Sequence, residues 1–299
     1  MNLKKTREKF TIITNPTAGN GKKKKLLEIV SSKLVENSMN IEIIESTNSN
    51  HAKEIAYRSS IIGNTIIACG GDGHVSNLSS IAAKNKTKFG IIPTGTGNDF
   101  ATSLGLYNIH NIVSALVNNK IELIDLWKLN NEVFCSVANI GFSAKANEWA
   151  NKRKFLRGSL LYFTSVISTI FNYKPLRLKV EVDEKIFEKK TWLIACANTS
   201  FFGGGMNIAP FVSPSDGFID LVCVGDVSRY EFLKTFPKVY SGEHINHHSI
   251  SYIRGKKIII DHRSKKNISV FADGEDYGNL PIKIEPLNFK LKQLVPIIN

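Results

Sequence analysis

Three absences narrow the class of protein before any motif is considered. No run of the sequence reaches the roughly 18 apolar residues of a membrane-spanning helix, so we expect no such span. No two of the four cysteines form a CxxC pair, and each lies in an apolar run: Cys69, Cys135, Cys196 and Cys223. This pattern excludes a disulfide-rich scaffold and favours reduced core thiols. The Walker sequence GxxxxGK[ST] is also missing, which excludes the common P-loop.

Acidic residues are scarce relative to basic ones. The chain has 26 Asp and Glu against 39 Lys and Arg, a formal net charge of +13. Such a surface attracts polyanions, namely nucleic acid, anionic lipid or phosphorylated small molecules. We interpret the lysine run 22–25 as the solvated first turn of a helix. Because the lysines are not interleaved with aromatic residues in a nucleic-acid module, we expect no nucleic-acid partner.

The order of apolar runs predicts two domains of different type in the 299 residues. Strand-like runs at 10–13, 41–44, 65–69 and 89–92 alternate with helix-like runs at 26–35, 50–60, 75–84 and 109–118. This alternation predicts an N-terminal, mainly parallel, three-layer α/β domain over 1–125. The remainder is expected to form a β-rich, sandwich-like domain over 126–286, with a tail, 287–299, that can return to the first domain.

The β-type runs expected in the second domain lie at 133–140, 176–183, 191–197, 218–224, 257–261, 267–272 and 281–285. Helices are expected there only at 155–171 and 228–239.

Glycine-rich segments follow three of the predicted strands, at 15–21, 70–73 and 95–97. Ligands of parallel sheets bind beyond the carboxyl ends of the strands, so these segments should meet at one crevice. Glycines let a ligand approach backbone N–H groups closely, which favours anions. Thr94, Thr96 and Asp99 add hydroxyls and a carboxylate suited to phosphate and metal. Taken alone, Gly-Gly-Asp-Gly at 70–73 is also compatible with a hairpin turn.

Six ordered motifs give the chain a resemblance to the diacylglycerol kinase catalytic-domain family, in particular to its compact bacterial lipid kinases. They are Asn15-Pro16-x-x-Gly19, Gly70-Gly71-Asp72-Gly73, Pro93-x-Gly95-Thr96-x-Asn98-Asp99-Phe100-Ala101, Gly203-Gly204-Gly205-Met206-x-Ile208-Ala209-Pro210, Asp216-Gly217-x-x-Asp220 and Asp273-Gly274-Glu275. The motifs extend over nearly the whole chain, and their order is more specific than any one of them.

This resemblance implies two domains around an ATP cleft and transfer of a phosphoryl group from ATP, with Mg²⁺, to a lipid hydroxyl such as that of diacylglycerol. Glu275 matches the family's general base, and Asp72 is expected to act in catalysis beside it. The residues expected to bind nucleotide are Asn15, Pro16, Thr17, Ala18, Gly19, Ser46, Gly71, Asp72, Gly73, His74, Val75, Ser76, Thr96, Asn98 and Asp99. Ser213, Asp216 and Phe218 match a site for structural magnesium. For Glu275, the preceding Asp-Gly pair is equally a strong hairpin signal.

Departures from the family pattern keep other functions open. The family usually has threonine after GGDG and then Val-Asn-Glu, whereas this chain has His74 and then Val75, Ser76 and Asn77, so that the glutamate is missing. A catalytically weak or inactive nucleotide- or lipid-binding homologue is therefore one alternative. A kinase of a soluble acceptor, of the NAD kinase type, is the other, because that type also uses a GGDG loop.

Reaching a lipid substrate without a membrane span requires contact with the bilayer surface. We expect a cytoplasmic protein that associates peripherally with the inner face of the membrane, drawn by anionic lipid. The segment 153–174 carries basic residues at both ends of an apolar run, so it suits either an interfacial helix or a core helix. His244, His247 and His248 are interpreted as surface polar residues. A β-rich domain with exposed edges can also pair as a homodimer.

Overall fold

The computed structural model describes residues 9–15, 21–145, 169–170, 172–263 and 267–297. The chain divides into two compact units, and it passes between them twice. The first unit is Met1–Ile124 together with Phe289–Asn299, and the second is Asp125–Asn288. The sequence-based boundary stands one residue later, after 125.

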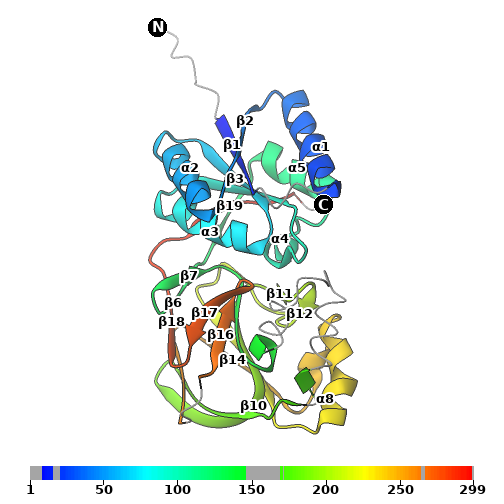
Figure 1. Cartoon of the computed structure of the whole chain (residues 1–299), viewed down its shortest axis with the longest axis vertical. Coiled ribbons are helices and arrows are strands. Elements are labelled where there is room, and N and C mark those ends of the chain that lie inside the picture. The colour runs from blue at the N-terminus through cyan, green and yellow to red at the C-terminus, as the bar shows by residue number, and fades with distance from the viewer. Residues whose placement is uncertain (1–8, 16–20, 146–168, 171, 264–266, 298–299) are drawn as a thin grey trace. The chain divides into compact units, whose positions relative to one another are not determined.

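The first unit contains a six-stranded sheet in the order β2-β1-β3-β4-β19-β5. Its strands are β1 (Lys9–Thr14), β2 (Asn40–Glu45), β3 (Thr65–Gly70), β4 (Lys88–Pro93), β5 (Ile121–Ile124) and β19 (Leu291–Leu294). All neighbours are parallel except β19 and β5. Every residue of β3 is buried, as expected of a central parallel strand covered on both faces. Figure 1 shows β19, from the C-terminal end of the colour range, among strands from the N-terminal end.

Helices cover this sheet. They are α1 (Lys22–Glu36), α2 (Ser49–Ile61), α3 (Asp72–Lys84), α4 (Asp99–Ser103) and α5 (Ile109–Asn118). Helix α1 packs with α5, and α2 packs with α3. The hairpin interpretation of the first Asp-Gly motif is wrong, because Gly70 ends β3, Gly71 caps α3 and Asp72 begins it.

The second unit is β-rich, as predicted. Its main sheet has eleven strands, with the path β17-β16-β8-β10-β9-β15-β18-β6-β7 and with β13 joining β10 to β14. The strands are β6 (Trp127–Leu129), β7 (Glu132–Phe134), β8 (Val137–Gly141), β9 (Leu176–Val182), β10 (Lys185–Ala197), β13 (Ile219–Gly225), β14 (Ile250–Gly255), β15 (Ile258–His262), β16 (Ser269–Ala272), β17 (Glu275–Asn279) and β18 (Ile282–Pro286). A two-stranded sheet pairs β11 (Phe201–Phe202) with β12 (Met206–Asn207).

Two predicted elements of this unit are interrupted. The strand expected at 133–140 breaks into β7 and β8, because the N–H groups of Cys135 and Ser136 donate to the Asp273 carboxylate. The helix expected at 228–239 becomes α8 (Arg229–Thr235) followed by the 3₁₀ helix η2 (Phe236–Val239). Pro237, which lacks an N–H group, stands in the first turn of η2 and explains the change. A second 3₁₀ helix, η3, spans Glu243–Asn246.

Most of the predicted helix 155–171, and with it most of the segment 153–174, lies outside the described residues. Residues 169 and 170 are helical. In the part of the chain that the structure describes, no helix combines the length and the apolar character needed to cross a bilayer. All four cysteines are buried thiols outside any disulfide, which confirms that prediction.

Candidate functional site

The order of the strands marks one edge of the first sheet as a binding site. From β1 the chain passes to β2 on one side and then to β3 on the other, so the switch point of the topology lies between β1 and β3. The carboxyl ends are aligned there, since Thr14 pairs with both Glu45 and Cys69. The loop after β1 begins at this switch point with Asn15, and its predicted nucleotide-binding residues 16–19 lie outside the described residues.

The loops after β3 and β4 touch each other through glycine backbone. A Cβ atom added to Gly95 would lie 2.3 Å from the Cα atom of Gly71. A Cβ atom on Gly97 would lie 2.9 Å from Oδ2 of Asp72. Thr94 N–H also donates to Gly70 O, at 2.9 Å. Two of the predicted glycine-rich segments therefore form one surface, and glycine is required there by close approach.

Asp72 holds these two loops together. Its Oδ2 accepts the N–H group of Asn98 at 2.8 Å, and its Oδ1 accepts that of Phe100 at 3.2 Å. The Asn98 side chain in turn accepts from Gly95 N at 2.8 Å and donates to Gly95 O. Asp72 thus positions the turn that leads into α4, where the buried Asp99 is the first residue. Its predicted role in catalysis stays a prediction.

Several of the other predicted nucleotide-binding side chains are buried. His74 Nε2 donates to Ile13 O at 3.0 Å, and burial lowers the pKa of His74, which keeps the ring neutral. The Ser46 hydroxyl donates to Thr14 O at 2.7 Å. Val75 and Ser76 are buried as well, whereas Thr96 is exposed. At His74 and Val75, contact with a phosphate would come from the main chain, since helices present N–H groups to anions in their first turn.

In the second unit, Glu275 follows a tight turn. Asp273 and Gly274 have φ values of 50° and 84°, and Ala272 pairs with Glu275, so the Asp-Gly pair forms the two-residue hairpin between β16 and β17. The buried Asp273 carboxylate accepts the N–H groups of Cys135 and Ser136, both at 2.9 Å. The hairpin interpretation is confirmed for this motif. It is compatible with a catalytic Glu275, because the turn fixes an exposed carboxylate at the start of β17.

Arg254 forms an ion pair with Asp216, the carboxylate of the predicted magnesium site. Its Nη1 lies 3.1 Å from Oδ2 of Asp216, while its Nε and Nη2 donate to the buried Asp220 at 2.8 and 3.2 Å. The other Asp216 oxygen accepts Phe218 N–H at 3.0 Å. The hydrogen bond to Asp220 raises the pKa of Arg254, so its charge is permanent. The guanidinium carbon is 5.7 Å from the Phe218 ring centroid.

An apolar pocket lies within the second unit. Its lining includes side chains from β10, β13 and α8, from the segments between them and from the residues just after β8, among them Phe142, Leu193, Phe202, Met206, Val224 and Phe232. Glu231, His244 and His247 also line it. The interpretation of all three late histidines as surface residues is wrong for His244, which is 4% exposed and whose Nε2 donates to Ile208 O. Sequence reasoning missed this pocket because its lining residues are far apart in the chain.

Comparison with known proteins places both units in one family. Residues 9–129 match the diacylglycerol kinase catalytic domain. Residues 136–295 match the YegS C-terminal domain, described as NAD kinase beta sandwich-like. A diacylglycerol kinase of Mycobacterium tuberculosis (strain CDC 1551 / Oshkosh) is 30% identical over 298 residues, which cover 96% of this chain and 95% of the relative. The chain belongs to the diacylglycerol kinase family.

Other members of the family agree with this assignment. A diacylglycerol kinase of Bacillus subtilis (strain 168) is 30% identical over 279 residues, with 90% of each chain covered. A solved structure of a diacylglycerol kinase from Bacillus anthracis str. Sterne has the same fold, with a TM-score of 0.73 and 21% identity over 96% of this chain and 97% of that one. Membership of the diacylglycerol kinase family supports a kinase, that is, a phosphotransferase.

The magnesium site that the diacylglycerol kinase family implies at Ser213, Asp216 and Phe218 stays a prediction. Magnesium prefers a shell of oxygen ligands with at least one carboxylate. The Asp216 carboxylate accepts Phe218 N–H and pairs with Arg254. A second, buried carboxylate lies against the same loop, where Oδ2 of Asp125 accepts Gly217 N–H at 2.7 Å. We derive no step through this ion.

Proposed function

We propose that the chain is an ATP-dependent lipid kinase, with diacylglycerol or a related lipid alcohol as acceptor. The observation that carries the proposal is the pair of abutting glycine loops beside the β1/β3 switch point, in a unit that matches the diacylglycerol kinase catalytic domain. Curated relatives over most of the chain are named diacylglycerol kinase, which supports the lipid acceptor.

The first unit would bind the phosphates of MgATP. The first turn of α3 presents N–H groups at the switch point, and Thr96 adds an exposed hydroxyl. Asp72 keeps the loop that carries Thr96 in place through Asn98 and Phe100. Magnesium entering with ATP would neutralise part of the phosphate charge and so lower the repulsion that the attacking oxygen meets.

The second unit would receive the acceptor. Its apolar pocket, built from residues such as Leu193, Met206 and Phe232, suits an acyl chain. The net charge of +13 favours approach to anionic lipid. Phe211 and Tyr230, at 72% and 76% exposure, offer aromatic side chains to an interface. We therefore propose action at an anionic membrane surface.

Glu275 would act as the general base. The lipid hydroxyl oxygen forms a bond to the γ-phosphorus, the bond from that phosphorus to the β–γ bridging oxygen breaks, and ADP leaves. The hydroxyl proton passes to the Glu275 carboxylate, which the turn at Asp273-Gly274 holds at the start of β17.

A label-transfer assay tests this proposal. Purified protein is incubated with γ-labelled ATP, magnesium and vesicles that mix diacylglycerol with anionic phospholipid. We expect label in lipid, and we expect Glu275→Gln to lower the rate by at least about a hundredfold. Asp276→Asn, next along the exposed strand β17, is the matched control and should keep the rate. Transfer that survives in Glu275→Gln would contradict the base assignment.

The same assay separates the alternatives. ATP binding without transfer to any acceptor would favour an inactive homologue, to which His74 and Asn77 already point. Transfer to NAD but not to vesicles would favour the soluble-acceptor kinase.

We expect Asp72→Ala to abolish both ATP binding and turnover, because it releases the N–H groups of Asn98 and Phe100. Unchanged ATP binding in that variant would place the nucleotide elsewhere.

A further inference from the structure

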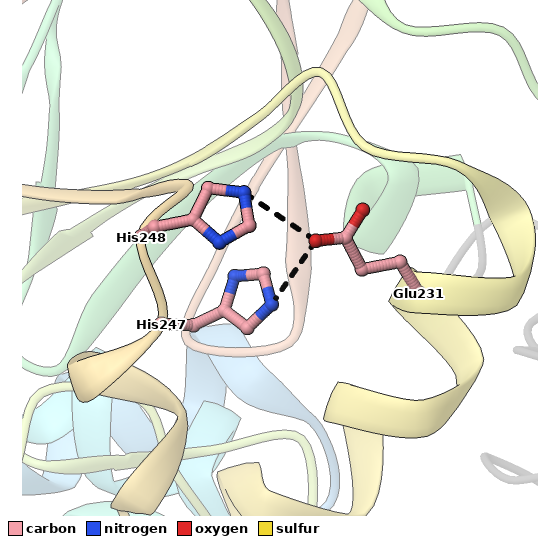
Figure 2. Close-up of side chains that lie close together, drawn as sticks. All are labelled: Glu231, His247 and His248. Atoms are coloured by element: carbon pink, nitrogen blue, oxygen red, sulfur yellow. Dashed lines mark ion pairs between the residues drawn. The ribbon is translucent and has the colours of Figure 1, made fainter.

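Three side chains from two segments converge beside the apolar pocket, outside the proposed catalytic residues. Figure 2 shows the rings of His247 and His248 side by side, with the Glu231 carboxylate directed at both from helix α8. Oε1 of Glu231 lies 3.3 Å from Nε2 of His247 and 3.4 Å from Nε2 of His248. The three ligand atoms lie within 4.8 Å of one another, the one such group of His, Cys, Asp or Glu among the described residues.

These distances suit a shared metal ion better than direct ion pairs. A charge-assisted N–H···O bond is typically about 2.7–2.9 Å long. Two zinc ligands at about 2.0–2.1 Å from the ion, at a tetrahedral angle, stand about 3.3–3.4 Å apart. Both separations from Glu231 are close to that edge of a tetrahedron. A small shift of the exposed His248 would complete the third edge.

The surroundings orient two of the ligands. His247 Nδ1 lies 2.8 Å from the Ser249 hydroxyl and accepts the Ser249 N–H at 3.4 Å, so binding of a metal ion at Nε2 requires the ring proton to move to Nδ1, where the hydroxyl can accept it. Glu231 is in the first turn of α8, where its own N–H group donates to the capping hydroxyl of Ser228 at 3.1 Å. Sequence reasoning missed the group because Glu231 lies 16 residues before His247, and only the fold brings the two side chains together.

We propose that Glu231, His247 and His248 form a site for a divalent transition-metal ion of the zinc class. Two imidazole nitrogens and one carboxylate oxygen select such an ion over magnesium or calcium, which prefer all-oxygen shells. The ion has a fourth position open to water. Because Glu231 and His247 also line the apolar pocket, the bound ion ties α8 to the segment before β14 and restrains one side of that pocket.

Equilibrium dialysis of the untagged full chain against Zn²⁺, followed by metal analysis, tests the site. Wild-type protein should retain one Zn²⁺ per chain, and Glu231→Gln and His248→Gln should each weaken binding by at least about tenfold. His110→Gln, an exposed histidine on α5, is the matched control and should bind as wild type does. No retained Zn²⁺ in wild type, or equal retention in all four proteins, would overturn the proposal.

Hydrogen exchange supplies a second readout that does not use catalysis. Zn²⁺ should slow exchange in residues 229–235 and 247–250 of wild type, and the slowing should be absent from His248→Gln. His248 is 76% exposed in its side chain, so this variant is expected to fold normally. Slowing that persists in His248→Gln would show that Zn²⁺ binds elsewhere.

Discussion

His74 links the first turn of α3 to strand β1 through a neutral imidazole. Its Nε2 donates to Ile13 O, and its side chain fills the space beside Gly70, where an added Cβ atom would lie 2.7 Å from the His74 ring. The histidine that replaces the family's usual threonine therefore packs between α3 and the sheet. The backbone of residue 74 still belongs to the first turn of α3.

This residue gives the folded state a dependence on pH. Burial lowers the pKa of His74 below its ordinary value of 6.5, so below that pH the unfolded chain binds a proton that the folded chain does not. Stability is therefore lost as pH falls below 6.5, by up to about 1.4 kcal/mol per pH unit. His244, whose pKa burial also lowers, contributes with the same sign. Between pH 7.5 and pH 5.5, we expect His74→Thr to lose less stability than wild type in urea unfolding, by at most about 1.4 kcal/mol.

His110→Thr, at an exposed position of α5, controls for the change of residue type. An equal loss of stability on acidification in wild type and in His74→Thr would contradict this account of His74.

Residue types that share one loop could be predicted, but their partners could not. The glycines at 71, 95 and 97 and the acid at 72 stand out in the sequence as a phosphate-loop pattern. The sequence does not show that Gly95 must be glycine because of Gly71, or that Asp72 accepts the N–H of Asn98. Both contacts depend on the meeting of two loops that are 20 or more residues apart in the chain.

Among the elements, strands β13 and β14, which pair with each other, are also joined by the side chain of Arg254. Arg254 reaches Asp220, which is fully buried, and Asp216 at the loop before β13. Removing one partner of a buried pair leaves a buried charge without compensation, which costs about 3–5 kcal/mol. The side chain of Arg254 is 41% exposed, so solvent screening reduces that cost. We expect Arg254→Met to lower the free energy of unfolding by about 2 kcal/mol, measured in urea.

The double variant Arg254→Met/Asp220→Asn should recover part of this loss, because it also removes the buried charge. If the double variant were less stable than Arg254→Met alone, the charge of Asp220 would not be the cause.

The periodicity of apolar residues predicted most helices and strands. It failed where a side chain accepts backbone N–H groups that would otherwise pair with a neighbouring strand. The alternation in the first 125 residues predicted the parallel sheet. It missed the break at Cys135 and Ser136, because Asp273, which takes their N–H groups, lies far along the chain. It missed the five-residue helix α4, which is too short for a period to show. The burial of His244 depends on Ile208, again a distant partner.

At the scale of the whole molecule, the first unit depends on a strand that follows the second. Strand β19 lies between β4 and β5, and its Leu291, Gln293 and Leu294 are fully buried. We expect a chain ending at residue 288 to expose the core of the first unit while the second unit stays folded. Alkylation read by mass spectrometry checks this, because Cys69 reports the first unit and Cys196 and Cys223 report the second.

In the intact chain all of these thiols should react slowly. Burial raises the pKa of Cys69 and of Cys223 to about 11, so each is protonated near neutral pH as well as covered. In the shortened chain, Cys69 should react at least about tenfold faster, with Cys196 and Cys223 unchanged. A chain ending at residue 295 keeps β19 and is the control. Unchanged protection of Cys69 without β19 would show that β4 and β5 do not need it.

The place of β19 also sets an order of events on the ribosome. Residues 1–124 emerge first, yet their sheet has a gap between β4 and β5 until residues 291–294 have been synthesised. The second unit contains all of its own strands by residue 286 and so can complete its fold earlier. The glycine loops at the β1/β3 edge therefore reach their final support only after the second unit is made. Under the proposed function, a nascent chain would then not bind nucleotide fully before the unit that receives the acceptor exists.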